Sequence, residues 1–280
     1  MTDRRVVLVT GSTDGIGRAT ARALAAGGMK VILHGRTKPR LDATLAQLTD
    51  ELPGAELEGV SFDLGSQVAV RRGAEQILAR FPALHVLINN AGIFATDRVV
   101  TDGVELTFAV NHLGPFLLTE LLAPRLEASA SAGVPSRVIN VASIAHTRGR
   151  IHLDDLTLAR GWTGYAAYAM SKLANVMHAM SLAEAHAPDK LVAYALHPGV
   201  IGTKLLRQGF GPIAGAAAET GARTSVRLAG EDGITAPSGS YFSEGVQTQP
   251  AVNARDAAMR AALWQASAQL TGAGPDARPA

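Results

Sequence analysis

The stretch Thr10-Gly11-Ser12-Thr13-Asp14-Gly15-Ile16-Gly17 follows a short apolar run and precedes a helical pattern. Its glycines are spaced G-x-x-x-G-x-G. At a strand-to-helix turn, glycines permit a tight bend, close approach of the backbone to a pyrophosphate, and close packing of helix on sheet. The N-terminus of the next helix offers N–H groups to phosphate. An ordinary glycine-rich turn is the alternative. The pattern predicts a dinucleotide-binding turn made by Gly11, Ser12, Thr13, Asp14, Gly15, Ile16 and Gly17.

The end of the second expected strand indicates which dinucleotide binds. An acidic residue about 20 residues beyond the glycines would hold the ribose 2′-hydroxyl of NAD. This chain has His34-Gly35-Arg36 at that place, without an acid. Because a guanidinium pairs with phosphate and stacks on flat rings, Arg36 predicts NADP(H) as the cofactor. A solvated arginine at a strand end is the alternative.

Short β-branched apolar runs alternate with helical patterns along the chain, which is typical of βαβ units and a parallel sheet. The runs are apolar on both faces, as in strands that helices cover on either side. We expect an α/β fold in one domain over residues 1–280. Its core would be a single Rossmann-type, doubly wound parallel sheet of about seven strands with helices on both faces. The expected strands are Val6–Thr10, Lys30–Gly35, Glu58–Phe62, His85–Asn89, Arg137–Ser143 and Leu191–His197, and the expected helices are Arg18–Gly27, Pro39–Glu51, Gln67–Phe81, Val104–Ser129 and Tyr165–Ala187.

Two segments interrupt this alternation, an insert at 144–164 and a glycine-rich segment at 200–221. The insert is longer than most connections between a strand and a helix. Both segments follow expected strand ends, and ligands of open α/β sheets bind outside those ends. We expect the insert and a lid-like 200–221 segment to form the substrate site. The candidate substrate contacts are Ser143, His146, Tyr165 and Leu205; for His146 a loop role, and for Tyr165 a packing role, is the alternative.

Tyr168 and Lys172 lie four residues apart in a helical stretch, so they share one helix face. A tyrosine hydroxyl has a pKa of about 10, and a nearby ammonium lowers it. Such a pair can act as a general acid for a carbonyl or a general base for an alcohol. Taken alone, this spacing is weak evidence for a catalytic pair, because many surface helices contain it by chance.

Composition excludes several other classes of protein. The formal net charge is only +2 and no cysteine is present, so a nucleic-acid surface, a disulfide scaffold and thiolate chemistry are all disfavoured. The eight histidines form no compact cluster with metal-ligand spacing, so we expect no metal site. The first apolar run is too short for a signal peptide, and no stretch approaches 18 apolar residues. We expect a cytoplasmic protein without a membrane anchor.

The glycine turn together with the Tyr168–Lys172 pair resembles the short-chain dehydrogenase/reductase family, and the resemblance covers nearly the whole chain. Asp63-Leu64 is similar to the family's pair near the adenine ring. Asn89-Asn90-Ala91-Gly92 resembles its N-N-A-G motif. Pro198-Gly199, with Thr203 beyond, resembles the segment that covers the nicotinamide. The resemblance implies cofactor contacts at Asp63, Leu64, Asn90, Ala91, Gly92, Tyr168, Lys172, Pro198, Gly199 and Thr203.

The same resemblance implies a catalytic set of Asn111, Ser143, Tyr168 and Lys172. Tyr168 would donate a proton to the carbonyl oxygen, and Ser143 would hydrogen-bond and polarise that carbonyl. Lys172 would lower the pKa of Tyr168 and hold the nicotinamide ribose. Asn111 would position a water molecule in a proton path to solvent. NADPH would deliver hydride to the substrate.

Within the family the chain is similar to the retinol-dehydrogenase-like branch. Ile151–Leu156 resembles that branch's insert, which accounts for the 25 residues between Ser143 and Tyr168. We expect an NADP(H)-dependent oxidoreductase that interconverts a carbonyl and an alcohol, with a small-molecule substrate that is a hydrophobic aldehyde, ketone or alcohol. A protein that senses or scaffolds through bound NADP(H) without turnover is the alternative.

The apolar helices around Leu106–Leu126 and Ala166–Ala185 also bear on assembly. Family members commonly pair through these helices, and here their apolar faces are wide. We therefore expect a homo-oligomer, a dimer or tetramer. The alternative is a monomer capped by the long insert and the C-terminal tail.

Overall fold

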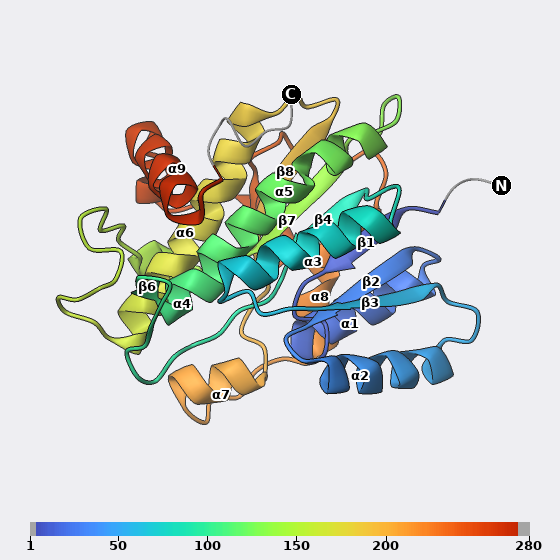
Figure 1. Ribbon diagram of the computed structural model, residues 1–280, viewed down its shortest axis with the longest axis horizontal. Coiled ribbons are helices and arrows are strands. Elements are labelled where there is room, and N and C mark those ends of the chain that lie inside the picture. Colours follow the sequence, from blue (N-terminus) through green and yellow to red (C-terminus); the bar gives the residue numbers. More distant parts are fainter. Residues whose placement is uncertain (1–3, 274–280) are drawn as a thin grey trace.

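The computed structural model describes residues 4–273, so residues 1–3 and 274–280 of the expected domain lie outside the described part. A single eight-stranded sheet runs through the molecule in the order β10-β9-β8-β7-β4-β1-β2-β3 (Figure 1). All six expected strands are present. The strands of this sheet are β1 (Val6–Val9), β2 (Lys30–Gly35), β3 (Leu57–Ser61), β4 (Val86–Asn89), β7 (Ser136–Val141), β8 (Leu191–His197), β9 (Tyr241–Ser243) and β10 (Val246–Thr248).

Seven of these strands are parallel, from β3 at one edge to β9, which confirms the doubly wound α/β architecture. The chain order reverses at β1, which has β2 on one side and β4 on the other. β10 is an additional antiparallel strand at the other edge. A small hairpin of β5 (Val100–Thr101) and β6 (Val104–Glu105) stands apart from the sheet. These extra strands have two or three residues each, too few for an apolar period to show in the sequence.

Alternate strand residues face two separate apolar layers, as the pleat of a strand dictates. Val7 and Val9 of β1 belong to one layer, and Leu8 between them belongs to the other. One layer packs under α1, α2 and α8, and the other under α3, α5 and α6. The helices are α1 (Gly15–Ala26), α2 (Lys38–Glu51), α3 (Gln67–Arg80), α4 (Leu106–Phe108), α5 (Gly114–Ser129), α6 (Gly164–Ala185), α7 (Lys204–Phe210), α8 (Ala218–Gly230) and α9 (Ala257–Thr271).

The expected helix Val104–Ser129 differs from the observed structure in a way that matters for the site. It starts at α4, continues as a π-helical turn η1 (Ala109–Leu113), and becomes regular only in α5. π-turns inside helices are rare and occur frequently at functional sites. Asn111, a candidate catalytic residue, lies in the middle of η1. At the junction, Gly114 packs so closely on the Leu64 carbonyl that a Cβ there would lie 2.2 Å from its oxygen.

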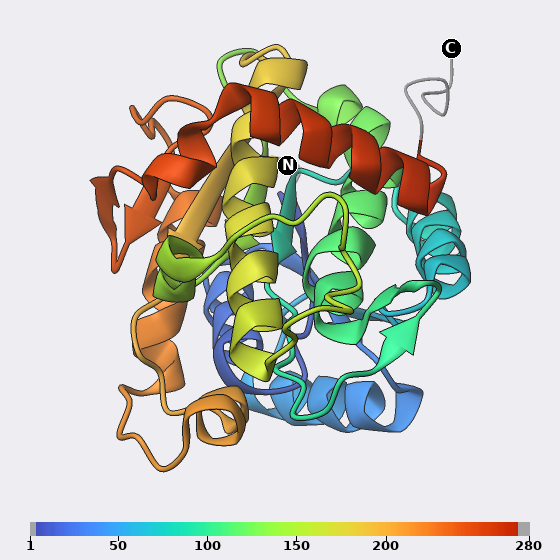
Figure 2. The same ribbon diagram turned by 90° about the vertical axis from the view of Figure 1, so that its left-hand side faces the viewer.

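The C-terminal helix α9 packs across α6 and α5 (Figure 2). Leu263 of α9 belongs to the same apolar layer as Phe116 of α5 and Met177 of α6. The wide apolar faces that led us to expect pairing of copies through these helices are therefore covered in part by the chain's own C-terminus. By length and composition Leu106–Ser129 could cross a membrane, but 78% of its apolar window is buried inside the molecule.

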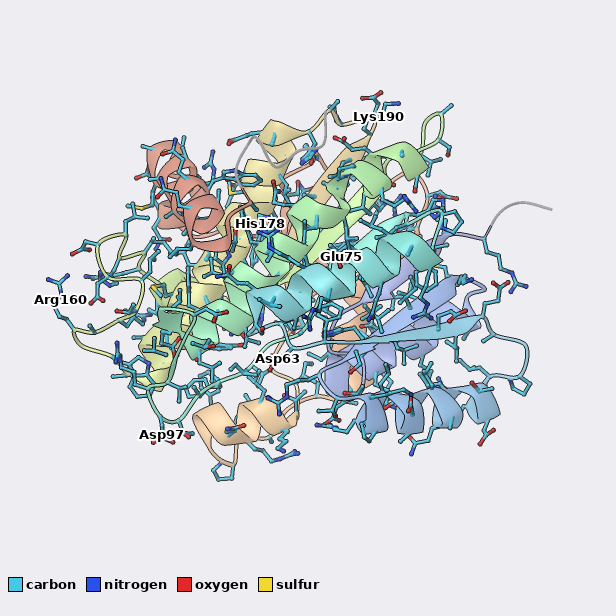
Figure 3. All side chains as sticks on the ribbon, viewed as in Figure 1. Asp63, Glu75, Asp97, Arg160, His178 and Lys190 are labelled. Atoms are coloured by element: carbon cyan, nitrogen blue, oxygen red, sulfur yellow. The ribbon has the colours of Figure 1, made fainter. Side chains whose placement is uncertain are left out.

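The two irregular segments have more structure than the sequence indicates. The insert opens with a 3-10 turn, η2 (Ile144–Arg148), and then forms a loop with Arg160 at its outer tip (Figure 3). The Asp155 carboxylate closes that loop, accepting from the backbone N–H groups of Ala159 and Arg160 at 2.8 and 3.0 Å. These hydrogen bonds hold the pKa of Asp155 well below its ordinary value. The 200–221 segment contains the whole of α7 and the first turn of α8.

Candidate active site

The glycine turn lies between β1 and α1, at the carboxyl edge of the sheet. Gly11 and Gly15 have φ angles of +63° and +52°, a conformation that strongly favours glycine. A Cβ on Gly17 would lie 2.3 Å from the Gly11 carbonyl oxygen, so the third glycine is required by packing. Asp14 caps α1, because its carboxylate accepts from the Gly15 N–H at 2.8 Å. The predicted turn is therefore present, with the helix N-terminus behind it.

Residues that directly follow β1 and β4 support this turn. The Thr10 hydroxyl accepts from the backbone N–H groups of Asn90 and Ala91, both at 3.0 Å. The Asn90 amide donates to the Thr10 carbonyl at 2.8 Å and to the Gly11 carbonyl at 3.3 Å. The side chain of Asn90, expected to contact the cofactor, is thus used to join the N-N-A-G motif to the glycine turn. Thr10 belongs to the same support, and sequence reasoning gave it no role.

His34 is a second supporting residue that sequence reasoning missed. The Gly11 N–H donates to its Nδ1 at 3.1 Å, and its Nε2–H donates to the Phe62 carbonyl at 3.0 Å. The Ser12 hydroxyl bonds to the backbone of the same residue, accepting from its N–H at 2.8 Å. Burial lowers the pKa of His34 to about 4, which keeps the ring neutral and able to accept. β2 therefore fixes the entry to the turn.

The residues expected around the adenine end lie in different environments. Arg36 follows β2 and is exposed, and among residues 4–273 it forms no ion pair with an acidic side chain. Asp63 is also exposed; it follows β3 and lies between α3 and α7 in the view of Figure 3. Its carboxylate accepts from the Gly65 N–H at 2.8 Å. The Leu64 side chain, in contrast, is 5% exposed and belongs to the core, so only its backbone can face a cofactor.

The three chemically important side chains come together from two elements. Ser143 stands beyond β7 and caps η2, with its hydroxyl accepting from the Ala145 N–H at 3.2 Å. Tyr168 and Lys172 share a face of α6, as their spacing predicts. The Tyr168 hydroxyl interacts with the Ser143 hydroxyl. Lys172 Nζ donates to the carbonyl of Val141 at 2.9 Å, which holds the ammonium under the end of β7.

The two buried titratable side chains, Tyr168 and Lys172, have shifted pKa values. Burial raises the pKa of Tyr168 to about 12, against the opposing effect of the Ser143 hydroxyl. Burial also lowers the pKa of Lys172 to about 8. We expected Lys172 to lower the pKa of Tyr168, and the structure shows the opposite net direction. The cause is loss of water around both groups, which disfavours phenolate and ammonium alike.

Asn111 lies next to this group and uses its whole amide to hold the loop after β4. Its Oδ1 accepts from the Ile93 N–H at 2.8 Å, and its Nδ2 donates to the Ile93 carbonyl at 3.0 Å. Nδ2 also donates to the Ser171 hydroxyl at 3.0 Å, which joins η1 to α6. A Cβ on Gly92 would lie 3.4 Å from both Asn111 Oδ1 and Lys172 Nζ. The side chain thus positions this loop, and its water-binding role stays a prediction.

An apolar cluster covers Tyr168 from the side of the lid. Phe94 and Phe210 lie 5.5 and 6.0 Å from its ring centre, and Leu205 packs against the same cluster. Phe210 and Leu205 belong to α7, so the lid-like segment does reach the candidate site. Thr203 begins α7 as its cap and packs toward the glycine turn, 3.3 Å from where a Cβ on Gly15 would stand.

The remaining candidates divide into a rim residue and a buried one. Tyr165 is 42% exposed, with its ring 6.0 Å from that of Phe210, so it lies at the edge of the apolar cluster. His146 is 1% exposed, and both its ring nitrogens are hydrogen-bonded to the backbone, to Ser143 and Ala251. That position behind Ser143 corrects the expected substrate contact at His146. Pro198 and Gly199 follow β8, where Gly199 has a φ of +93°.

A family model described as short chain dehydrogenase matches residues 5–210. The chain belongs to the short-chain dehydrogenase/reductase family. Retinol dehydrogenase 12 of Homo sapiens is 37% identical to it over 278 residues, which cover 96% of this chain and 86% of the relative. Within the family the chain is thus retinol-dehydrogenase-like, as its sequence suggests.

Solved structures agree with this assignment. A protein from Mycobacterium Paratuberculosis aligns with a TM-score of 0.79 and 34% identity, over 96% of this chain and 93% of that one. A blue fluorescent protein from a metagenomic library, in complex with NADPH, aligns with a TM-score of 0.68 and 27% identity. The alignment covers 85% of this chain and 95% of that protein. The fold is therefore the family's Rossmann fold, and the chain is an oxidoreductase of that family.

Proposed function

We propose that the protein uses NADP(H) to interconvert a hydrophobic aldehyde or ketone and its alcohol. The observation that carries this is the position of the Tyr168 hydroxyl, which meets Ser143 beside the apolar cluster of Phe94, Leu205 and Phe210. A polar reacting group beside an apolar cluster suits a substrate with one carbonyl on an apolar body. The relatedness to retinol dehydrogenase 12 supports the same substrate class.

The chain fits a dinucleotide at the glycine turn. The left-handed Gly11 and Gly15 leave the turn without side chains where a pyrophosphate would approach, in front of the N-terminus of α1. The exposed Arg36 at the end of β2 suits a 2′-phosphate. Lys172 Nζ, beside Gly92, would hold the nicotinamide ribose. Support for NADP(H) over NAD(H) also comes from the similar protein in complex with NADPH.

The side chains then have distinct tasks in reduction. NADPH supplies the hydride to the carbonyl carbon when bound. Ser143 donates a hydrogen bond to the carbonyl oxygen and so stabilises the negative charge that develops there. Tyr168 gives its phenol proton to that oxygen, completing the alcohol. With a pKa raised to about 12, Tyr168 is protonated at neutral pH, the form that reduction requires.

The experiment that tests this is consumption of NADPH by the purified protein with a carbonyl panel. The panel contains aromatic aldehydes, long aliphatic aldehydes, retinal, ketosteroids and quinones, and NADH is run in parallel. Turnover of an apolar carbonyl with NADPH preferred is the expected result. Binding of NADPH without turnover of any panel member would favour the non-catalytic alternative.

Location and assembly form part of the same proposal. We infer a cytoplasmic protein without a membrane anchor. The burial of Leu106–Ser129, the stretch within residues 4–273 that is long and apolar enough to span a membrane, supports this. Cell fractionation with an extraction at high pH tests it. A homo-oligomer remains our proposal for assembly, although α9 covers part of the face first expected to pair. Sedimentation that shows only a 29 kDa species would exclude it.

A further inference from the structure

The imidazole of His146 joins Ser143 to a distant part of the chain. Its Nδ1–H donates to the Ser143 carbonyl at 2.7 Å, and its Nε2 accepts from the Ala251 N–H at 3.2 Å. A ring that accepts at Nε2 must carry its one proton at Nδ1. The backbone amide of Ala251 therefore selects the tautomer that can donate to Ser143.

The Nδ1–H group of His146 acts on Ser143, whose hydroxyl would polarise the substrate carbonyl. The Ser143 carbonyl also accepts from the His146 N–H at 3.1 Å, so two hydrogen bonds fix its peptide plane. The Ser143 hydroxyl is itself bound to the Ala145 N–H in the same turn. Rotation of that peptide plane would turn η2 and move the hydroxyl away from Tyr168. A displacement of about 1 Å in such a group can cost about 100-fold in rate.

The short turn η2 is held from both sides. Toward the catalytic helix, Gly149 packs so closely that a Cβ there would lie 2.4 Å from the Ala169 carbonyl oxygen. On the opposite side, Asn253 donates to the Gly149 carbonyl at 2.7 Å, next to the Ala251 contact. The ring of Tyr241 packs against His146 at 4.8 Å between centres. η2 thus lies between α6 and the segment of residues 251–253, which we call the C-terminal clasp.

We propose that His146 is a positioning residue for Ser143, with the C-terminal clasp setting its tautomer. The proposal rests on the proposed function, since it assigns a part in the reaction through Ser143. The match to the family model ends at residue 210, so the clasp lies outside the segment by which the family is recognised. The two ring hydrogen bonds of His146 go to Ser143 and Ala251, so the side chain acts through Ser143.

Two substitutions separate the two hydrogen bonds of the ring. In His146→Asn the amide nitrogen takes approximately the place of Nδ1, keeps the donor to Ser143, and needs no tautomer selection. In His146→Gln the longer side chain places its amide near Ala251 and leaves the Ser143 carbonyl without the side-chain donor. We expect kcat to stay within about threefold of wild type in His146→Asn and to fall about tenfold or more in His146→Gln. KM for NADPH should change little in either variant, because the glycine turn is untouched.

Asn253→Ala is the matched control, because it removes the other tether of the clasp and leaves both bonds of His146. We expect it to lower thermal stability and to reduce kcat less than His146→Gln does, because the hydrogen bond from His146 to the Ser143 carbonyl is kept. Equal losses of kcat in His146→Asn and His146→Gln would show a purely structural role and overturn the proposal. Unchanged kcat in His146→Gln would overturn it as well.

A measurement on the wild-type protein keeps the proposal testable without any turnover. Nitrogen NMR of protein with ¹⁵N-labelled histidine reports which ring nitrogen carries the proton, and the signal missing from His146→Asn identifies His146. We expect the Nδ1–H form. An Nε2–H form would overturn the proposal whatever the activity. If no panel carbonyl is reduced by the wild type, the proposed function fails, and the NMR result still decides the geometry by itself.

Discussion

Lys172 Nζ lies 5.6 Å from the centre of the Tyr168 ring and donates its hydrogen bond to the Val141 carbonyl. The two residues are neighbours on α6, and burial is the largest influence on each pKa: it raises that of Tyr168 and lowers that of Lys172. Tyr168 is 6% exposed under the lid, and Lys172 is 3% exposed. The phenol is therefore held as an acid and the amine as a weakened base.

Tyr168→Phe should reduce kcat by at least about 100-fold, since the proton donor is lost while the ring still packs on Phe94. NADPH affinity, measured by fluorescence titration, should stay close to that of wild type. Tyr194→Phe is a suitable control, because it removes the hydroxyl of another buried tyrosine, which donates to the Ala236 carbonyl at 3.2 Å. Wild-type turnover in Tyr168→Phe would remove Tyr168 from the mechanism.

Gly17→Ala should weaken NADPH binding by about tenfold or more. Its Cβ would stand 2.3 Å from the Gly11 carbonyl oxygen and 2.4 Å from Asn90 Nδ2, so the glycine turn must move. Gly27→Ala, at the other end of α1, is the control, since no atom lies closer than 3.4 Å to its Cβ. Dissociation constants from calorimetry compare the two variants, and equal affinities would contradict the packing argument.

Arg36→Ala should lower the preference for NADPH over NADH by about tenfold or more, because a charge-assisted pair with the 2′-phosphate is lost. The ratio of kcat/KM for the two cofactors measures it. Lys38→Ala is the comparison, two residues further on at the start of α2, where the ammonium is already bound to Asp42 at 2.6 Å. A larger change in Lys38→Ala than in Arg36→Ala would show that Lys38, and not Arg36, sets the preference for NADPH.

The parts of this fold that the sequence predicts are those with long, strongly patterned elements. The six β-branched runs became strands, and i,i+4 spacing correctly put Tyr168 and Lys172 on one face of α6. Short strands such as β9 and β10 gave no pattern to read. α8 was missed because its first turn falls in the glycine-rich segment that we interpreted as irregular.

The sequence predicts the parts of the candidate site in which the residue type alone indicates the chemistry. It predicts less well the residues whose position and partners depend on contacts between distant parts of the chain. His34 was read only as a neighbour of Arg36, because its bond to Gly11 joins residues 23 positions apart. His146 was expected to face substrate, but its Nε2 meets Ala251, 105 positions away. Leu64 follows Asp63 in a motif, yet its side chain is buried in the core. No local pattern encodes these partners.

Acid should destabilise the protein through His34. Its pKa is about 4 in the folded chain and 6.5 when unfolded, so between these values only the unfolded chain binds the proton. The free energy of unfolding therefore falls as pH drops from 6.5 toward 4, by about 1.4 kcal/mol per pH unit for this group. In His34→Asn, where an amide oxygen can still accept from Gly11, that part of the slope should disappear. Urea unfolding at several pH values measures it, and an unchanged slope would contradict the assignment to His34.

Phe210→Ala should alter both substrate affinity and the alkaline limb of the pH–rate profile. The ring lies 5.4 Å from Phe94 and 6.0 Å from Tyr168, so its loss removes apolar contacts and admits water to the phenol. We expect KM for an apolar carbonyl to rise about fivefold, as for an aromatic contact worth about 1 kcal/mol.

Because burial is what raises the pKa of Tyr168 to about 12, added water should move it back toward 10. Reduction needs the protonated phenol, so kcat/KM should then begin to fall at lower pH in Phe210→Ala than in wild type. Val246→Ala, on the exposed edge strand β10 and 68% exposed, is the control and should change neither value. An alkaline limb that stays in place in Phe210→Ala would mean that the lid does not set the acidity of Tyr168.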